Sequence, residues 1–328
     1  MRLVFLGSPA FAVPSLTALL AAGHDVGLVV TQPDRPAGRG QRTTPPAVAA
    51  YARERGLPLW QTASLRGAEA EARLAGVGAD AMALAAFAAL VPRNILELTP
   101  GGILNVHPSL LPRWRGAAPI QAALLAGDLE TGASIIRLVS ALDAGPILLQ
   151  ERTPVAPEDD FVSLEPRLAR LGADLLVRAL AEKPEPMPQD DSLATFCRRI
   201  ERDDARIDWS QPAETIWHQV RAYRGWPQAF TFVDGRLLKI LRATPLADAG
   251  AHGRHAGEST SEEEIDSAGS EASRAGEAGT LSLEGGVPVV ATGAGRLRLD
   301  EVQLEGKRAM PGAEFARGYP RLNTTKLA

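Results

Sequence analysis

The stretch that is most informative about chemistry is LNVHPSLLPRWRGAAPI, residues 104–120. Asn105 and His107 lie two residues apart, and side chains alternate along a strand, so both should project from the same face. An asparagine and a histidine side by side can donate hydrogen bonds to one developing oxyanion. Asp143, in the segment LDAGP, is a carboxylate that could orient or charge the imidazole and accept a proton from an attacking amine.

Each of these residues also has a purely structural explanation. A lone histidine before a proline, such as His107, is more often structural than catalytic. Asn105 and Asp143 are of the types that commonly form turns. Residue types and spacing therefore leave open whether this is a catalytic site.

The elements that must position these residues alternate between strands and helices. Short apolar runs predict strands at 2–6, 25–31, 57–61, 79–86, 103–107, 134–139 and 147–151. Periodic segments predict helices at 14–22, 51–55, 68–74, 119–125 and 164–181. This alternation is typical of an α/β domain with a mostly parallel sheet. Ligands bind at the carboxyl ends of such strands, where Asn105 and His107 would lie.

The composition changes at KPEPMPQ, residues 183–189, where prolines alternate with polar residues. From about residue 207, short strands with turn signals at Asp234-Gly235 and Gly293–Gly295 predict a small OB-like β-barrel. Trp209, Trp217 and Trp226 are expected in its core. We therefore predict three parts: a first domain, a linker and a barrel domain, at 1–186, 187–206 and 207–328.

The Gly/Ala/Ser/Glu-rich tract at about 248–279 interrupts the barrel domain. It has too few apolar residues to offset the entropy of ordering, so we expect a disordered insertion. Its eight acids and two arginines carry a net charge of −6, so the rest of the chain carries +2 of the total of −4. The net negative charge of the whole chain therefore does not exclude a basic surface or a nucleic-acid partner.

Overall composition sets further limits. The chain has 328 residues, of which 45% are hydrophobic and 23% charged, which excludes collagen-like, coiled-coil and wholly disordered proteins. Cys197 is the only cysteine, so there is no disulfide framework or Cys-rich zinc site, and we expect no bound metal. The apolar runs, of which the longest covers 81–91, are too short for a signal peptide or a membrane span. We expect a soluble, cytoplasmic protein.

The segment 31–42 is basic, with Arg35, Arg39 and Arg42 against Asp34 alone. Its glycines and prolines predict an irregular loop rather than regular structure. On composition it reads as a solvated surface loop.

The motif NVHPSLLPRWRGAAPI, together with LDAGP, closely resembles the folate-dependent formyltransferases. Within that family, four further matches favour the enzymes that formylate methionyl initiator tRNA: GSPAFAVPSL at 7–16, TQPDRPAGRG at 31–40, DDARIDW at 203–209 and EGKRAM at 305–310. The matches run from residue 3 to about 310 and so cover both domains.

The resemblance implies a fold and a reaction. The fold is a Rossmann-like formyltransferase domain followed by an OB-like barrel that binds tRNA. The donor is 10-formyltetrahydrofolate, and the acceptor is the α-amino group of methionine on initiator tRNA. The family's catalytic residues fall on Asn105, His107 and Asp143, of which Asp143 would keep His107 protonated. We expect a monomeric enzyme that acts in the cytoplasm without DNA, membrane or metal.

The resemblance also implies two sets of binding residues. The folate set is Phe87, Ala88, Leu90, Ser109, Leu110, Leu111 and Pro112, with Phe87-Ala88 standing where relatives commonly have Tyr-Gly. The tRNA set is Arg35, Arg39, Arg42, Arg198, Arg199, Lys307 and Arg308. With the resemblance, the basic segment 31–42 is interpreted as a clamp over the acceptor stem, its arginines contacting phosphates and bases.

Three other functions compete with this interpretation. A folate-dependent formyltransferase acting on an amino sugar or another small amine would share the chemistry but lack the basic loop and the tRNA-binding barrel. A dinucleotide-dependent oxidoreductase would need the glycine fingerprint that GSPAFA and GAGRLR lack. A non-catalytic tRNA-binding protein would leave Asn105, His107 and Asp143 as a coincidence.

Overall fold

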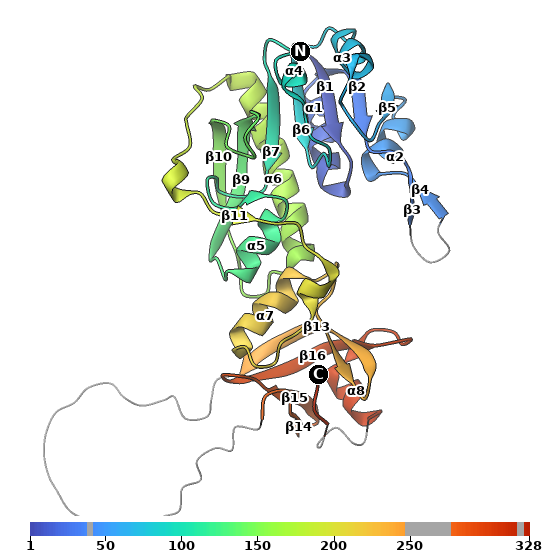
Figure 1. Cartoon of the computed structure of the whole chain (residues 1–328), viewed down its shortest axis with the longest axis vertical. Helices are drawn as coiled ribbons and strands as arrows, with labels where there is room; N and C mark the ends of the chain where they lie inside the picture. Colours follow the sequence, from blue (N-terminus) through green and yellow to red (C-terminus); the bar gives the residue numbers. More distant parts are fainter. Residues whose placement is uncertain (38–41, 247–276, 320–324) are drawn as a thin grey trace, which may run out of the picture. The chain divides into compact units, whose positions relative to one another are not determined.

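The chain divides into two units, Met1–Ile200 (unit 1) and Glu201–Ala328 (unit 2). The structure is a computed structural model, and it describes residues 1–37, 42–246, 277–319 and 325–328 (Figure 1). The expected insertion at 248–279 lies outside the described residues except for its last three, and so does Arg39.

A seven-stranded sheet organises unit 1, in the order β10-β9-β7-β6-β1-β2-β5. Strands β1, β2, β5, β6 and β7 are parallel to one another, and β9 and β10 add an antiparallel edge beside β7. This confirms the expected mostly parallel sheet. The strands are β1 Arg2–Gly7, β2 Asp25–Thr31, β5 Leu59–Gln61, β6 Ala81–Ala85, β7 Ile103–His107, β9 Glu130–Arg137 and β10 Ile147–Pro154.

Helices cover both faces of this sheet. On one face, α6 packs against α1, β7, β9 and β10. On the other face, side chains of α3 and α4 join the apolar cluster formed by β1, β2, β6 and β7. The helices are α1 Val13–Ala21, α2 Ala47–Glu54, α3 Ala68–Ala75, α4 Arg93–Leu96, α5 Pro119–Leu125 and α6 Phe161–Glu182, with a 3₁₀ turn η1 at Ala10–Ala12.

Two short strand pairs lie beside the main sheet. The pair β3 Arg35–Ala37 and β4 Arg42–Thr44 is antiparallel, so the prediction that 31–42 lacks regular structure was wrong for its ends. The second pair, β8 Arg115–Gly116 and β11 Phe196–Cys197, is parallel. It fastens residues from the expected linker onto unit 1, and the 3₁₀ turn η2 at Asp191–Leu193 precedes it.

Unit 2 is a curled antiparallel sheet in the order β12-β13-β16-β15-β14, with β17 paired to β16. Apolar residues from these strands and from two helices form one core, which confirms a small barrel-like domain. The predicted hairpin at Asp234-Gly235 joins the first two strands. The elements are η3 Arg202–Ala205, α7 Ala213–Ala222, β12 Phe230–Val233, β13 Arg236–Leu246, β14 Leu281–Glu284, β15 Val287–Ala291, β16 Arg296–Leu304, β17 Met310–Pro311 and α8 Gly312–Arg317.

The tryptophans of unit 2 do not all lie in the core. Trp209 is buried, and Trp217 packs against the core cluster. Trp226 is exposed, so its predicted place in the core was wrong. It follows α7 in a loop before β12, where no element of the described residues covers the ring.

Candidate active site

Strand β7 presents Asn105 and His107 on one face of the sheet. All five of its residues are buried, because β6 and β9 flank it on both sides. Val106 points to the opposite face, where α6 approaches so closely that a Cβ on Gly172 would lie 2.4 Å from a Val106 methyl carbon. This close packing fixes the strand and therefore the direction of Asn105 and His107.

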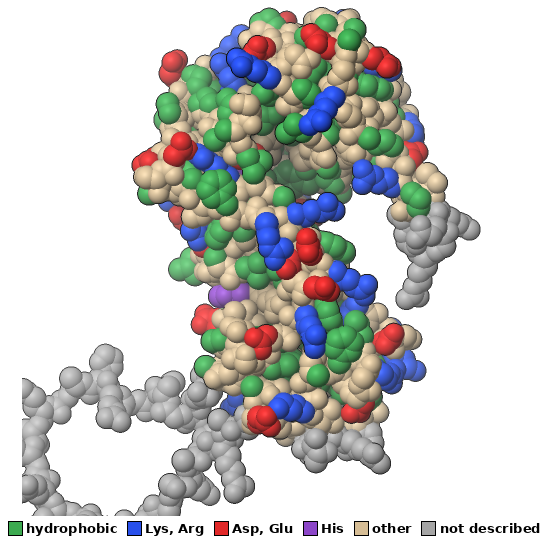
Figure 2. Space-filling view, in the orientation of Figure 1, with side chains coloured by type: hydrophobic (Ala, Val, Ile, Leu, Met, Phe, Trp, Pro, Cys, Tyr) green, Lys and Arg blue, Asp and Glu red, His purple; other side chains and the backbone are tan. Residues whose placement is uncertain are grey.

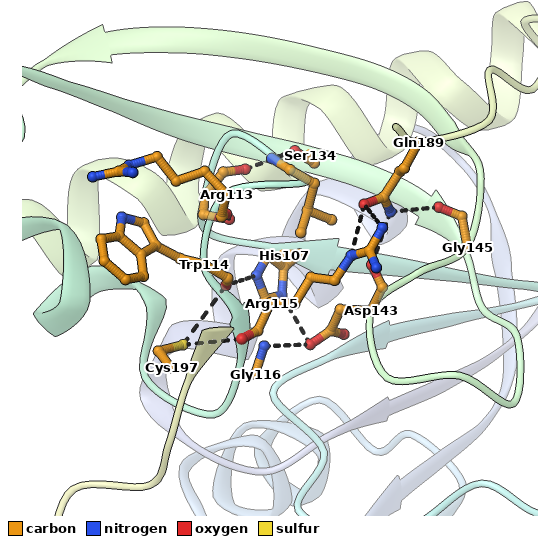
Figure 3. Close-up of polar contacts among 12 residues, drawn as sticks. His107, Arg113, Trp114, Arg115, Gly116, Ser134, Asp143, Gly145, Gln189 and Cys197 are labelled. Atoms are coloured by element: carbon orange, nitrogen blue, oxygen red, sulfur yellow. Dashed lines mark hydrogen bonds and ion pairs between the residues drawn. The ribbon is translucent and has the colours of Figure 1, made fainter. Parts of the chain in front are cut away.

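The His107 ring is held between a carbonyl and a carboxylate (Figure 3). Its Nε2 lies 2.9 Å from the carbonyl oxygen of Trp114, and because a carbonyl can only accept, Nε2 carries the proton. Its Nδ1 lies 3.7 Å from Oδ2 of Asp143. The structure thus brings together the two residues that the sequence placed 36 positions apart.

The Asp143 turn is tied down by its neighbours. Asp143 has a φ of +47°, and its Oδ2 accepts a 2.9 Å hydrogen bond from the backbone N–H of Gly116. The side-chain amide of Gln189 donates to the carbonyl oxygens of Asp143 and Gly145 at 2.8 and 2.7 Å. The buried Arg115 guanidinium in turn donates to Gln189 Oε1. These contacts fix the carboxylate toward His107.

Asn105 is 6% exposed, and among the described residues its side-chain amide has no hydrogen-bond partner. The amide atoms are not enclosed, so they are accessible to a ligand atom. Because Asn105 and His107 share a face of β7, that atom would also lie near the imidazole.

The loop after β7 is built on internal hydrogen bonds. The Ser109 hydroxyl donates to the carbonyl oxygen of Arg113 at 2.6 Å, and Ser134 donates to the carbonyl of Ser109 at 2.6 Å. Gln150 donates to the carbonyl of Leu111 at 3.0 Å. The Ser109 hydroxyl and the backbone groups of Ser109 and Leu111 are therefore engaged within the structure, and both side chains are buried. The partly exposed side chains of Leu110 and Pro112 remain for a ligand.

The remaining predicted folate residues lie after β6. Phe87 is buried in the apolar cluster on the α3 face of the sheet. Ala88 is exposed, and Leu90 is 67% exposed. The structure thus offers a partly apolar surface along this loop.

The predicted tRNA residues within the described parts of the chain are exposed. Arg35 donates to Gln32 Oε1 at 3.0 Å, and Arg308 pairs with Glu314 at 2.6 Å. Arg198, Arg199 and Lys307 are also exposed, while Arg42 is described only by its backbone in β4.

Sequence reasoning missed the residues that support Asp143. Gly116 and Gln189 bind Asp143 from 27 and 46 positions away, and Arg115 in turn donates to Gln189. The signal that could have drawn attention to Arg115 is its position inside the recognised motif, in RWRG. No sequence signal pointed to Gln189, because it follows a proline-rich stretch outside the recognised motifs.

Burial lowers the pKa of the His107 imidazole below its ordinary value of 6.5, although the Asp143 carboxylate and the Trp114 carbonyl act in the opposite direction. The neutral ring is therefore favoured in the folded protein. Such a ring can accept a proton at Nδ1, on the side that faces Asp143.

This shift predicts a pH dependence of stability. As pH falls, His107 is protonated in the unfolded chain before it is protonated in the folded protein. The contribution of neutral His107 to the free energy of unfolding is therefore full above the unfolded pKa of about 6.5 and is lost below it. We expect His107→Gln to lose less of its free energy of unfolding than the wild type between about pH 7.5 and 5.5, measured by urea denaturation. Parallel curves for the two proteins would contradict the shift, since the other histidines are common to both.

Comparison with known proteins shows to which protein family the chain belongs. Residues 1–180 match the family described as formyl transferase, and residues 199–320 match the formyl transferase C-terminal domain. The methionyl-tRNA formyltransferase of Dechloromonas aromatica (strain RCB) is 40% identical over 323 residues, which cover 98% of this chain and 96% of that protein. That of Anaeromyxobacter dehalogenans (strain 2CP-1 / ATCC BAA-258) is 42% identical, with 98% of each chain covered. This chain therefore belongs to the methionyl-tRNA formyltransferase family of formyl transferases.

Solved structures share the fold. The N-formyltransferase from Helicobacter canadensis, in complex with folinic acid and dTDP-3-aminofucose, matches with a TM-score of 0.63 at 16% identity, covering 91% of this chain and 98% of that one. HypX from Aquifex aeolicus in complex with tetrahydrofolic acid matches with a TM-score of 0.60 at 17% identity, covering 98% of this chain. The chain spans 48% of the length of HypX.

In the described parts of the chain, no helix is long and apolar enough to cross a membrane. The same residues contain no group of three or more His, Cys, Asp or Glu side chains placed to hold a metal ion.

Proposed function

We propose that this protein transfers the formyl group of 10-formyltetrahydrofolate to the α-amino group of methionine esterified to initiator tRNA. The observation that carries the proposal is full-length similarity, at 40–42% identity, to methionyl-tRNA formyltransferases. The meeting of Asn105, His107 and Asp143 at the end of β7 supports it.

The site fits a formyl donor because the Asn105 amide has no partner among the described residues and remains accessible to a ligand atom. The loops after β6 and β7 would hold the donor, with Ala88, Leu90, Leu110 and Pro112 offering side chains. The bound donor supplies an activated formyl group. Asn105 would donate its amide hydrogen bond to the formyl oxygen as that oxygen gains negative charge.

His107 would accept the proton of the incoming amine, and Asp143 would stabilise the charge that results. A free α-amine titrates near pH 8, so a useful fraction is neutral and nucleophilic at pH 7. His107 is largely neutral at that pH, since burial lowers its pKa, and its Nδ1 can accept the proton that the amine loses. The resulting imidazolium lies between the Asp143 carboxylate and the Trp114 carbonyl, which both stabilise its charge. It would then return the proton to the folate nitrogen as the bond between that nitrogen and the formyl carbon breaks, so that tetrahydrofolate leaves.

We assign formyl transfer to unit 1 and tRNA recognition to unit 2 together with basic residues of unit 1. Arg35, Arg198, Lys307 and Arg308 are exposed and can contact phosphates. We further propose a monomer that acts in the cytoplasm, where initiator tRNA is charged and used. Light scattering after gel filtration tests the monomer, and a dimer mass would contradict it.

A substrate comparison tests the proposed function. The protein is incubated with 10-formyltetrahydrofolate and either methionyl initiator tRNA or a nucleotide-linked amino sugar, and formylated product is quantified. Formylation of the tRNA is the expected result. Formylation of the sugar alone would assign the protein to the small-amine formyltransferases instead.

Arg39 tests the tRNA clamp. Flanking glycines, in Gly38-Arg39-Gly40, let the backbone approach a ligand closely, and the arginine fork suits phosphate or a guanine edge. Arg39→Ala should therefore lower kcat/KM for methionyl initiator tRNA by about tenfold or more, in line with roughly 1–3 kcal/mol per bidentate contact, and leave the KM for the folate unchanged. It should also make tRNA binding less sensitive to salt. An unchanged rate of the variant with charged tRNA would indicate that the segment is a solvated surface loop that does not bind tRNA.

A further inference from the structure

Trp226 stands out in unit 2 because its side chain is 56% exposed. Tryptophan carries a large apolar ring, and such area exposed to water commonly marks an interaction site. The mechanism above does not use it.

The hairpin next to Trp226 is aromatic on its outer face. In β12, Thr231 and Val233 are buried, while Phe230 and Phe232 lie on the other face and are only partly buried. Their rings contact each other edge to face with centroids 5.9 Å apart. Lys239 of β13 is paired with Phe230 across the hairpin. An outer face of an antiparallel sheet is ordinarily polar. The Arg206 guanidinium lies over the Phe232 ring, 5.8 Å from its centroid, which leaves Phe230 beside the exposed Trp226.

A cavity of about 230 Å³ lies at this place. It is smaller than the roughly 300–1,000 Å³ of pockets for drug-sized ligands, which suits a single planar ring. Its lining contains two cations and no acidic residue: Arg202, Trp226, Pro227, Gln228, Phe230, Leu237 and Lys239. Lys and Arg side chains also lie beside hydrophobic surface on the face of unit 2 shown in Figure 2.

The loop that carries the indole is held in place. The backbone N–H of Gln228 donates to the carbonyl of Tyr223 at 3.0 Å, and the Arg224 guanidinium pairs with Glu301 at 3.0 Å. Lys239 Nζ donates to Gln228 Oε1 at 2.6 Å. A site built in advance loses little conformational entropy when a ligand binds.

We propose that Trp226, Arg202 and Lys239 form a binding site for one unpaired nucleotide of the tRNA. The base stacks on the indole, and the two cations face the adjoining phosphates, as is common in proteins that bind single-stranded nucleic acid. The cavity lining supplies two cations and no acidic side chain next to an exposed ring, which favours RNA over a protein partner. The inference rests on the proposed function, because it takes the tRNA substrate as the ligand.

Substitution of the indole in the full-length protein tests the site. Trp226→Ala should weaken binding of a deacylated initiator tRNA transcript by about tenfold, within the roughly 5- to 150-fold range of one base–aromatic stack. It should raise the KM for methionyl initiator tRNA and leave kcat and the KM for the folate unchanged. Trp226→Phe, which keeps an aromatic ring, should retain most of the affinity. Leu283→Ala, which removes an exposed apolar side chain from β14 of the same unit, is the matched control and should bind like the wild type.

The salt dependence of tRNA binding tests the role of the two cations. Arg202→Gln should reduce the dependence of log Kd on log salt concentration by about one unit, the value for one lost phosphate contact. Unchanged tRNA affinity of a folded Trp226→Ala protein, in a preparation whose wild type formylates charged tRNA, overturns the nucleotide site and leaves the proposed function intact. A wild type that does not formylate charged tRNA contradicts the proposed function instead.

Discussion

Replacing Asn105 by alanine is expected to lower kcat for formyl transfer by about 100- to 1,000-fold, the usual cost of removing one oxyanion donor. The Asn105 amide has no partner among the described residues, so its loss breaks no hydrogen bond described in the fold. The melting temperature should therefore stay close to that of the wild type. Steady-state kinetics with 10-formyltetrahydrofolate and methionyl initiator tRNA, beside a thermal melt, measure both effects.

Two further variants make the result specific. Asn105→Asp keeps the size of the side chain but replaces the donor by an acceptor, and it should lose as much turnover as the alanine variant. Asn94→Ala is the control, because Asn94 is exposed on α4 and donates only to Glu71 at 2.6 Å. Turnover of Asn105→Ala within about threefold of the wild type would remove this amide from the reaction.

Element boundaries could be predicted where the chain carries a clear local signal. Strand β7 ends at His107 because Pro108 cannot donate to a central ladder, and α5 begins at Pro119, a residue favoured in the first helical turn. Helix α2 begins at Ala47, four residues before the predicted start, because a proline at its N-terminus gives no capping hydrogen bond to recognise. The short hairpin of β3 and β4 was missed, since prolines and glycines also form turns without strands.

The site could be predicted only in part. The alternation of a strand is enough to place Asn105 and His107 together. Asp143 was a candidate from its residue type, but only the family resemblance implied that it acts with them, because no local pattern says which loops meet in space. The same limit hid Gln189, whose amide fixes the Asp143 turn from 46 positions away. Exposure of Trp226 was hidden for a similar reason, since burial of a loop residue depends on which element covers it.

Substitution of Gly116 by alanine is expected to be as damaging as loss of a catalytic side chain, although Gly116 offers only its backbone. Its φ is +122°, and a Cβ there would lie 2.1 Å from the carbonyl oxygen of Cys197. The pair of β8 with β11 must therefore open, which moves the N–H that holds the Asp143 carboxylate. We expect kcat to fall by about 100-fold or more, as for loss of a positioned group. Strain and overpacking should together cost about 3 kcal/mol, or roughly 6–12 °C in Tm.

Gly78→Ala separates the clash from the backbone strain. Gly78 also has a positive φ, of +62°, but its Cβ would meet no atom within 4 Å, and it lies between α3 and β6, away from the Asp143 turn. It should lose about 1–2 kcal/mol of stability from strain alone and keep its turnover. Both variants carry backbone strain, but in Gly116→Ala the new Cβ also clashes with a backbone oxygen. Only Gly116→Ala should therefore lose activity in addition to stability. Equal losses of Tm in the two variants, with full turnover in both, would show that the β8–β11 pair does not position Asp143.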